Sequence, residues 1–261
     1  MFGHIRLLIR HGPLIRFLVK TRRRASVFGM LLGRTWFLLN PISQVAIYYF
    51  LVVVVFGAVP RQGISPFILI MMGVMHYGFI QQSISAAGNS VLQREKLLLQ
   101  LNIPPIIFVA SSFYYSIKDF VIAMAVYYCA HLLVGPPLEG SAWWYPAILV
   151  LLVLFAWSCC LLMATLAVYF RDLRNVTQVV MRILMYLSPV LYTVERVPQE
   201  FRTLYLLNPI GCLFGLLQWS ILGTAAPPVP AIVSMLTITF VLLLSAHIVY
   251  ARLSPNFTKA V

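Results

Sequence analysis

The sequence predicts an all-α polytopic membrane protein, with six transmembrane helices, an N-terminal amphipathic interface helix and a re-entrant helix pair before the last helix. Two observations lead to this class. Of the 261 residues, 61% are hydrophobic and only 10% are charged, whereas charged residues make up about a quarter of a soluble domain. The charged residues also leave long apolar stretches between them, and a helix of roughly 20 apolar residues crosses a bilayer.

The N-terminal segment, residues 1–34, is predicted to be cytoplasmic, amphipathic and basic, ahead of a six-helix transmembrane domain at 35–261. Basic residues recur four apart in it, with leucine and phenylalanine between them, which is typical of a helix lying in the membrane interface. The pairs are Arg6 with Arg10 and Arg16 with Lys20. Gly12-Pro13 predicts a break of this segment into two pieces.

Five apolar stretches then predict one crossing each. They cover residues 36–58, 66–91, 106–134, 143–170 and 175–192. The second half of 66–91 is rich in Gln, Ser and Asn, so this helix is expected to turn one face toward the protein interior or a pore. Arg182, inside the fifth stretch, is expected to face a dimer interior, to snorkel, or to pair with Asp119.

The uncharged run between Arg202 and Arg252 is too long for one helix across a bilayer. Prolines and glycines divide it, so we expect a re-entrant pair of half helices over Leu204–Leu222 and a sixth crossing over Ala231–Tyr250. Most of the 19 Lys and Arg residues then fall on the side of the N-terminus, which predicts that both termini are cytoplasmic.

Motifs for catalysis and for metal binding are absent from the sequence. It contains no GxxxxGK[ST], HExxH or GxSxG pattern, and its five histidines and four cysteines lack metal-ligand spacing. We therefore expect no catalytic residues and no metal. In a membrane protein the net charge of +13 reports orientation, so nucleic acid is not an expected partner.

Several short motifs occur in a distinctive order. They are Arg24, Leu38-Leu39-Asn40-Pro41, Val168-Tyr169-Phe170-Arg171-Asp172-Leu173, Leu187-Ser188-Pro189-Val190-Leu191-Tyr192, Val197-Pro198 and Asn208-Pro209. With the six-helix layout, this order resembles the permease subunit of bacterial ABC exporters for O-antigen, teichoic acid and related polysaccharides. The resemblance covers nearly the whole chain.

This resemblance implies a permease homodimer in the bacterial inner membrane, bound to two copies of a separately encoded ATPase. The chain itself would then be no enzyme and hold no cofactor, because ATP and Mg would bind to the ATPase. The cargo would be a surface polysaccharide, expected to be lipid-linked and carried out of the cytoplasm, with membrane lipids as further partners.

The resemblance also places the ATPase coupling element in the loop after the second crossing. Its residues would be Arg94, Glu95, Lys96, Leu97, Asn102 and Pro104. A short amphipathic helix there could seat in a groove of the ATPase, while the alternative is a solvated charge cluster that only fixes topology. Arg171 and Asp172 begin a second cytoplasmic turn, which is either a gating element or a local ion pair.

Aromatic side chains at mid-span are candidates for a glycan channel, because sugar C–H faces pack on aromatic rings. They are Tyr48, Tyr49, Tyr77, Phe79, Tyr186 and Tyr192. Arg22, Arg23 and Arg24 are candidates for binding the pyrophosphate of the lipid carrier, since guanidinium geometry suits phosphate oxygens. The alternative is that these three arginines only set orientation and touch anionic lipids.

Three other classes of function remain open at this point. The chain could be an ABC permease for a small amphiphile, such as a drug or a lipid. It could be an ion-coupled secondary transporter that uses Lys118, Asp119 and Arg182. An intramembrane enzyme is the third, although no catalytic motif supports it.

Overall fold

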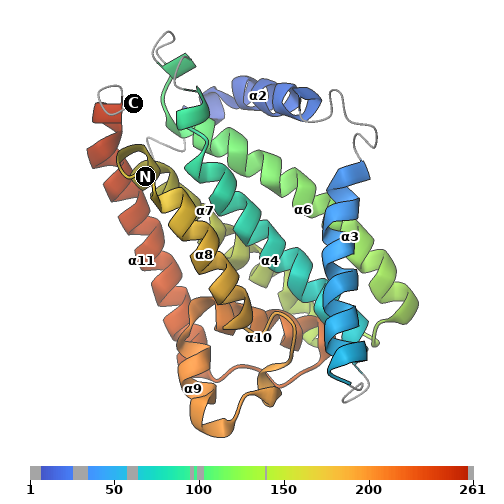
Figure 1. The fold of residues 1–261 in the computed structure, drawn as a ribbon. Coiled ribbons are helices and arrows are strands. Elements are labelled where there is room, and N and C mark those ends of the chain that lie inside the picture. Colours follow the sequence, from blue (N-terminus) through green and yellow to red (C-terminus); the bar gives the residue numbers. More distant parts are fainter. Residues whose placement is uncertain are drawn as a thin grey trace.

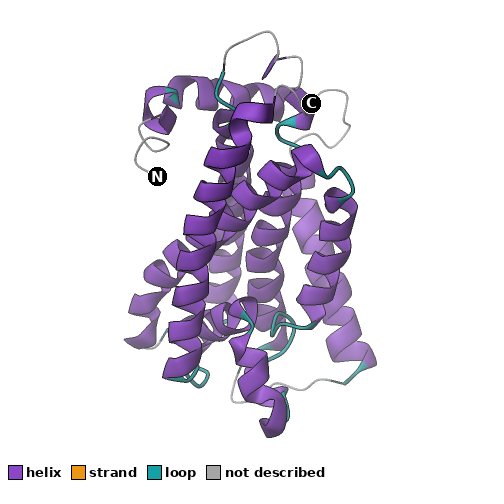
Figure 2. Cartoon of the chain, turned by 90° about the vertical axis from the view of Figure 1, so that its left-hand side faces the viewer, coloured by secondary structure: helices purple, strands orange, loops and turns teal. Residues whose placement is uncertain are grey.

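The structure, a computed structural model, describes residues 7–25, 35–57, 64–94, 97–98, 103–138 and 140–257. Within these ranges there is no β-strand, and Figure 2 shows helices joined by short loops. The long helices are α2 (Gly12–Ala25), α3 (Trp36–Tyr49), α4 (Pro66–Gly88), α6 (Ile106–Val134), α7 (Tyr145–Tyr169), α8 (Leu173–Tyr186), α9 (Gln199–Leu207), α10 (Pro209–Leu222) and α11 (Val229–Leu253). The shorter turns are η2 (Phe50–Val55, a π-helix), η3 (Leu92–Arg94), η4 (Gly140–Trp144), η5 (Val194–Arg196) and η6 (Ser254–Asn256).

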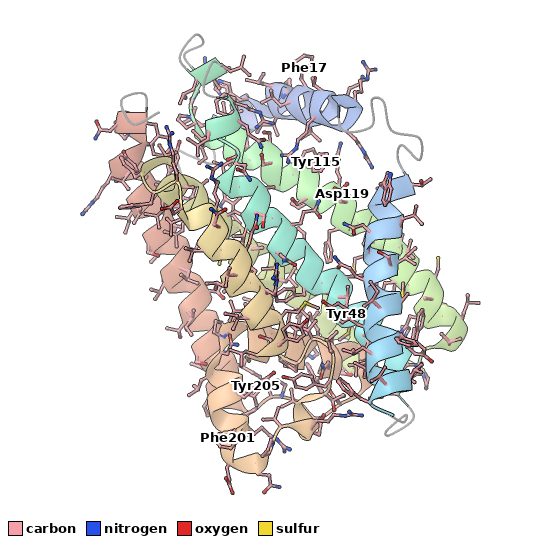
Figure 3. The ribbon with its side chains drawn as sticks, in the orientation of Figure 1. Phe17, Tyr48, Tyr115, Asp119, Phe201 and Tyr205 are labelled. Atoms are coloured by element: carbon pink, nitrogen blue, oxygen red, sulfur yellow. The ribbon has the colours of Figure 1, made fainter. Side chains whose placement is uncertain are left out.

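Helix α2 lies across one end of the bundle, against the first half of α6 (Figure 1). The predicted break is confirmed, because residues 7–10 are helical, His11 is a turn and α2 begins at Gly12. Val19 on the inner face of α2 is 1% exposed, while Phe17 points outward and is 63% exposed (Figure 3). Below, "the α2 end" denotes this end of the bundle, and "the α9 end" the opposite one.

Four helices are long and apolar enough to cross a membrane among the described residues, and α9 with α10 would make five as one bent span. The four are α4, α6, α7 and α11, and α6 has the predicted bounds, 106–134. The predicted first crossing, 36–58, is shorter than expected: α3 continues into the π-helix η2 and the chain then turns at Gly57, whose φ is +63°. The six-crossing layout therefore stays a prediction.

The predicted helix over 175–192 is wrong at its C-terminal end. Helix α8 ends at Tyr186, and residues 187–192 form turns and bends. Pro189 lacks an N–H and disfavours a helical conformation at Ser188, so the helix stops before this pair although the residues beyond it are apolar. With 14 residues, α8 is about 21 Å long, less than the roughly 30 Å of a hydrocarbon core.

The segment predicted as a re-entrant pair is two helices, α9 and α10, with a bend of 105° between them. The bend lies at the predicted position, Asn208-Pro209. The side-chain oxygen of Asn208 accepts a hydrogen bond from the Ile210 N–H at 3.1 Å and so caps α10. Both helices lie at the α9 end, from which α11 returns to the α2 end (Figure 1).

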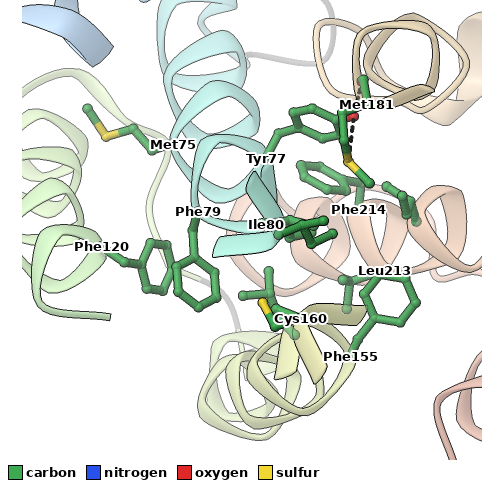
Figure 4. Close-up of a cluster of buried hydrophobic side chains, with 14 of the residues drawn as sticks. Met75, Tyr77, Phe79, Ile80, Phe120, Phe155, Cys160, Met181, Leu213 and Phe214 are labelled. Atoms are coloured by element: carbon green, nitrogen blue, oxygen red, sulfur yellow. Dashed lines mark hydrogen bonds between the residues drawn. The ribbon is translucent and has the colours of Figure 1, made fainter. Parts of the chain in front are cut away.

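Helix α4 is the centre of the bundle and packs on α3, α6, α7 and α8. The Tyr77 and Phe79 side chains of α4 point to opposite sides of the helix (Figure 4). Phe79 stacks on Phe120 of α6, with 4.5 Å between ring centroids. Tyr77 donates a hydrogen bond to the Met181 carbonyl of α8 and packs near Phe214 of α10. The core is therefore continuous from α6 through α4 to α8 and α10.

Residues 187–192, called the crossover segment below, are fixed by contacts from two helices. The Cα of Gly73 on α4 lies so close that a Cβ there would be 2.7 Å from the Val190 carbonyl carbon. Gln218 on α10 is 1% exposed, and its side-chain N–H groups donate to the carbonyls of Pro189 at 2.8 Å and Tyr192 at 3.0 Å. A buried carbonyl outside a helix needs such a partner, so Gln218 replaces the hydrogen bonds that a continuous helix would supply.

Substituting Gln218→Leu should lower the free energy of unfolding by roughly 2–4 kcal/mol, because the buried carbonyl of Pro189 and the half-buried carbonyl of Tyr192 lose their donor. Thermal unfolding of the detergent-solubilised protein measures this loss. Gln199→Leu, at an exposed position, is the matched control and should leave the midpoint unchanged. Equal midpoints for the two variants would contradict the role of Gln218.

The first turn of α6 is tied to the end of α11. The Tyr250 hydroxyl accepts a hydrogen bond from the Ile106 N–H at 2.9 Å and so satisfies one donor of the helix N-terminus. Beyond α11, Phe257 is 1% exposed and packs edge-on against Tyr169 and Tyr250. The end of the last helix is thus part of the α2 end of the core.

Candidate functional site

Three helices carry polar side chains four residues apart, a spacing that places them on one face of each helix. The sets are Asn40, Gln44 and Tyr48 on α3, Gln81, Ser85 and Asn89 at the end of α4, and Arg174, Gln178 and Arg182 on α8. Such a face is costly against lipid, so it must meet protein or water.

These faces meet at a cavity of about 710 Å³ between α3, α4, α6 and α8. The volume is within the range of ligand sites in proteins, roughly 300–1,000 Å³. Its polar lining residues are Asn40, Gln44, Gln81, Gln82, Ser85, Asp119, Gln178 and Arg182. Trp36, Phe79 and Phe120 add aromatic surface to the wall. The cavity therefore combines amide groups with ring faces inside a largely apolar protein.

Two opposite charges line the cavity without pairing. Gln82 donates a hydrogen bond to Asp119 Oδ2 at 3.1 Å, while Asp119 Oδ1 is buried and has no hydrogen-bond partner in the described part of the chain. Arg182 makes no hydrogen bond or ion pair with any described residue, so the predicted pairing with Asp119 is not formed. Arg182 is exposed where it lines the cavity, and a charged side chain within a membrane protein typically faces a bundle interior or a water-filled cavity. Figure 3 shows Asp119 on α6, between α2 and α3.

A cluster of arginines lies outside the cavity, where α2 and the end of α4 meet α6. Arg22 donates to the Ser112 hydroxyl at 3.1 Å and lies 4.8 Å from the Tyr115 ring centroid. Arg94 donates to the Ser111 hydroxyl at 3.0 Å and the Phe108 carbonyl at 3.3 Å. Burial and, secondarily, the charge of Arg22 lower the pKa of Arg94 to about 10. The α2 end is therefore rich in positive charge.

The predicted coupling residues are only partly within the described structure. Arg94 points inward onto α6, Leu97 is exposed, and Pro104 is half-buried before α6 begins. Glu95, Lys96 and Asn102 lie outside the described residues.

The other predicted basic and gating residues lie at the α2 end. Arg24 is exposed, and the charge of Arg23 acts on Asp119. Arg171 and Asp172 are both exposed. Just after this turn, Arg174 in the first turn of α8 donates to the side-chain oxygen of Asn89 at 3.0 Å and so joins α8 to the end of α4.

The six predicted channel aromatics are not gathered in one place. Phe79 alone of the six lines the cavity. Tyr77 is buried against α8, and the Tyr48 hydroxyl lies 3.6 Å from the Met185 sulfur. Tyr49 packs edge-on against Phe67. Toward the α9 end, the Tyr192 hydroxyl donates to the Tyr186 carbonyl at 2.9 Å and contacts the hydroxyl of Tyr205.

Most of the polar cavity lining was not predicted from the sequence, which suggested aromatic rings at mid-span instead. The polar residues that line the cavity were identified only as a property of residues 66–91 and as the isolated charges Asp119 and Arg182. Their four-residue spacing on α3, α4 and α8 was the available signal. A polar face on three apolar helices predicts that these helices enclose a common polar space.

The fold and the cavity define a multi-pass membrane protein with a polar interior suited to a hydrophilic solute. Residues 16–222 match the family described as ABC-2 type transporter, so the chain belongs to that family. It is similar to an O-antigen export system permease protein RfbA of Myxococcus xanthus, with 23% identity over 264 residues and all of both chains covered. A protein of the same name from Klebsiella pneumoniae is 24% identical over 244 residues, which are 92% of this chain and 90% of that one. These matches confirm the resemblance to polysaccharide-exporter permeases.

Proposed function

We propose that this chain is the membrane-spanning permease subunit of an ATP-driven exporter, which moves a lipid-linked cell-surface polysaccharide such as O-antigen across the bacterial inner membrane. Membership of the ABC-2 family and the names of the similar permeases support this proposal. The observation that carries it is the amide-lined cavity of about 710 Å³ within an apolar helix bundle. Carboxamides donate and accept hydrogen bonds, as sugar hydroxyls do.

The proposed topology has six crossings and both termini in the cytoplasm. Helix α3 with η2, and α8 with the crossover segment, would add two crossings to the four long apolar helices. The α9–α10 pair would then enter and leave from the outer side. In support, α2 and the end of α11 lie at the same end of the bundle (Figure 1). The α2 end would face the cytoplasm, and α2 would lie in the membrane interface.

The energy source would be two copies of a separate ATPase, which bind ATP and Mg and serve a homodimer of this permease. The loop that begins at Arg94 and ends at Pro104 would contact the ATPase. Because Arg94 bonds to Phe108 and Ser111, movement of this loop would reach α6 as well as α4. Arg171 and Asp172, which come directly before α8, would respond to the same movement.

The arginines of α2 would bind the phosphates of the lipid carrier. Arg22, Arg23 and Arg24 would hold the diphosphate near the cytoplasmic surface, because one guanidinium group can donate hydrogen bonds to two phosphate oxygens at once. The polysaccharide would pass along the cavity, where amides would bond to hydroxyls and the exposed Trp36 ring would pack on the C–H faces of sugar rings. Tyr48, Tyr49, Tyr186 and Tyr192 would continue this path toward the α9 end.

Affinity purification of the tagged chain from its own host in mild detergent should yield a P-loop ATPase in about equal amount. Deletion of the gene should leave the lipid-linked polysaccharide inside the cell, which surface labelling and extraction of the lipid fraction measure. A complementing wild-type copy is the control. If no ATPase copurifies and transport collapses with the proton gradient, an ion-coupled transporter replaces this proposal. If the deletion strain has normal surface polysaccharide but retains a drug or a lipid, the cargo is a small amphiphile instead.

A further inference from the structure

Among the residues that the structure describes, the lining of the cavity has no net charge. Asp119 contributes one negative charge and Arg182 one positive charge, and the other polar groups are five carboxamides and one hydroxyl. The whole chain, by contrast, has a net charge of +13. A second copy of the chain would add the same residues and leave the sum at zero.

Charge in the wall of a transport path reflects the charge of the solute. Pores for anions and phosphates carry rings of Arg or Lys, and pores for cations carry rings of Asp or Glu. Five amides with one negative and one positive side chain fit neither an anion pore nor a cation pore. They fit a solute whose polar groups are hydroxyls, since a hydroxyl donates and accepts as an amide does. The Trp36 ring, which lines the cavity and is 51% exposed, offers an apolar surface for its C–H groups.

Apart from Arg182, the described arginines of this region lie at the α2 end and do not line the cavity. Arg22 and Arg94 are hydrogen-bonded to neighbouring serines of α6, and Arg174 is hydrogen-bonded to Asn89. None of these three arginines lines the cavity. An anionic group could therefore be held at the α2 end, but a chain with a negative charge on every repeating unit would meet no excess of cations further in.

We propose that the cavity accepts an uncharged, hydroxyl-rich stretch of glycan, so that the transporter exports neutral polysaccharides and discriminates against acidic ones. This inference rests on the proposed function. It concerns the repeating units in the cavity and leaves the phosphates of the carrier at the α2 end. Gln44 of α3 and Gln178 of α8 both line the cavity and are exposed, so a lysine at either position would give the described lining a net positive charge.

The test uses the full permease with its ATPase in proteoliposomes. Two probes carry the same lipid diphosphate, one with a mannose polymer and one with a glucuronic acid polymer of equal length. We expect the wild-type complex to transport the neutral probe at least tenfold faster. Gln44→Lys and Gln178→Lys should each shift this ratio at least fivefold toward the acidic probe. Gln199→Lys, at an exposed position in α9, is the matched control and should leave the ratio unchanged.

The outcomes separate the two proposals. Equal or faster transport of the acidic probe by the wild-type complex would overturn the inference and leave the polysaccharide function standing. A ratio that stays unchanged in both folded lysine variants would overturn it as well. If neither probe is transported and neither stimulates ATP hydrolysis, the proposed function itself fails. The wild-type comparison decides the inference even where a lysine variant does not fold.

Discussion

Replacing Gly73 with alanine should deprive the permease of its folded structure. The new methyl group would overlap the carbonyl oxygen of Val190 and lie 2.7 Å from its carbonyl carbon. Both atoms belong to the backbone of the crossover segment, which Gln218 holds in place through the carbonyls on either side. Neither α4 nor the crossover segment can move aside cheaply, and overpacking of a tight core costs about 1–3 kcal/mol or more.

The measurement is the yield of monodisperse protein in detergent and its thermal midpoint. We expect Gly73→Ala to lose most of the monodisperse fraction. Gly78→Ala is the matched control on the same helix, because nothing lies within 4 Å of the position of its Cβ. A Gly73→Ala protein that unfolds at the wild-type temperature would show that the approach of α4 to Val190 is not needed for the fold.

Replacing Arg182 with methionine should abolish export without harming the fold. Arg182 lines the cavity, and in the part of the chain that the structure describes it has no ion pair or hydrogen bond to lose. Because the Arg182 side chain is exposed, its replacement by methionine should leave the thermal midpoint unchanged. Transport should fall at least tenfold, because the guanidinium donors are lost and Asp119 leaves the cavity negative.

Transport and thermal unfolding of the same preparation check this prediction together. Arg252→Met provides the comparison, since Arg252 is an exposed residue near the end of α11 and away from the cavity. Full transport by Arg182→Met would remove Arg182 from the transport path. A large fall in the thermal midpoint would instead indicate that the arginine is structural.

Hydrophobicity alone was enough to predict the long helices. The bounds of 106–134 were correct at both ends, because Pro105 precedes the helix and Gly135 follows it. The end of α8 was misplaced because residues 187–192 are as apolar as a helix interior. The sequence signal for the correct end of α8 is Pro189, because proline interrupts a helix. The break at Asn208-Pro209 was correct, since proline is favoured at the start of a helix and asparagine at its cap.

The candidate site was less predictable, because it depends on which faces of separate helices meet. Phe79 was assigned to a channel and does line the cavity, but the amides of Gln44 and Gln178 were not singled out. The structural roles of Gly73 and Gln218 could not be predicted from the residues next to them in the sequence. Each acts on the crossover segment, which lies far from Gly73 along the chain and well before Gln218.

The hydrogen bond between Tyr250 and Ile106 joins residues 144 positions apart, and this separation bears on how the protein is made. The N-terminal turn of α6 leaves the ribosome long before α11 does. The hydrogen bond from the Ile106 N–H to the Tyr250 hydroxyl can therefore form only after α11 has been synthesised. Biogenesis of the α2 end is thus completed only by the final helix. A chain terminated before Tyr250 would keep most of its apolar segments for insertion, yet it would lack this contact and the packing of Phe257 that follows it.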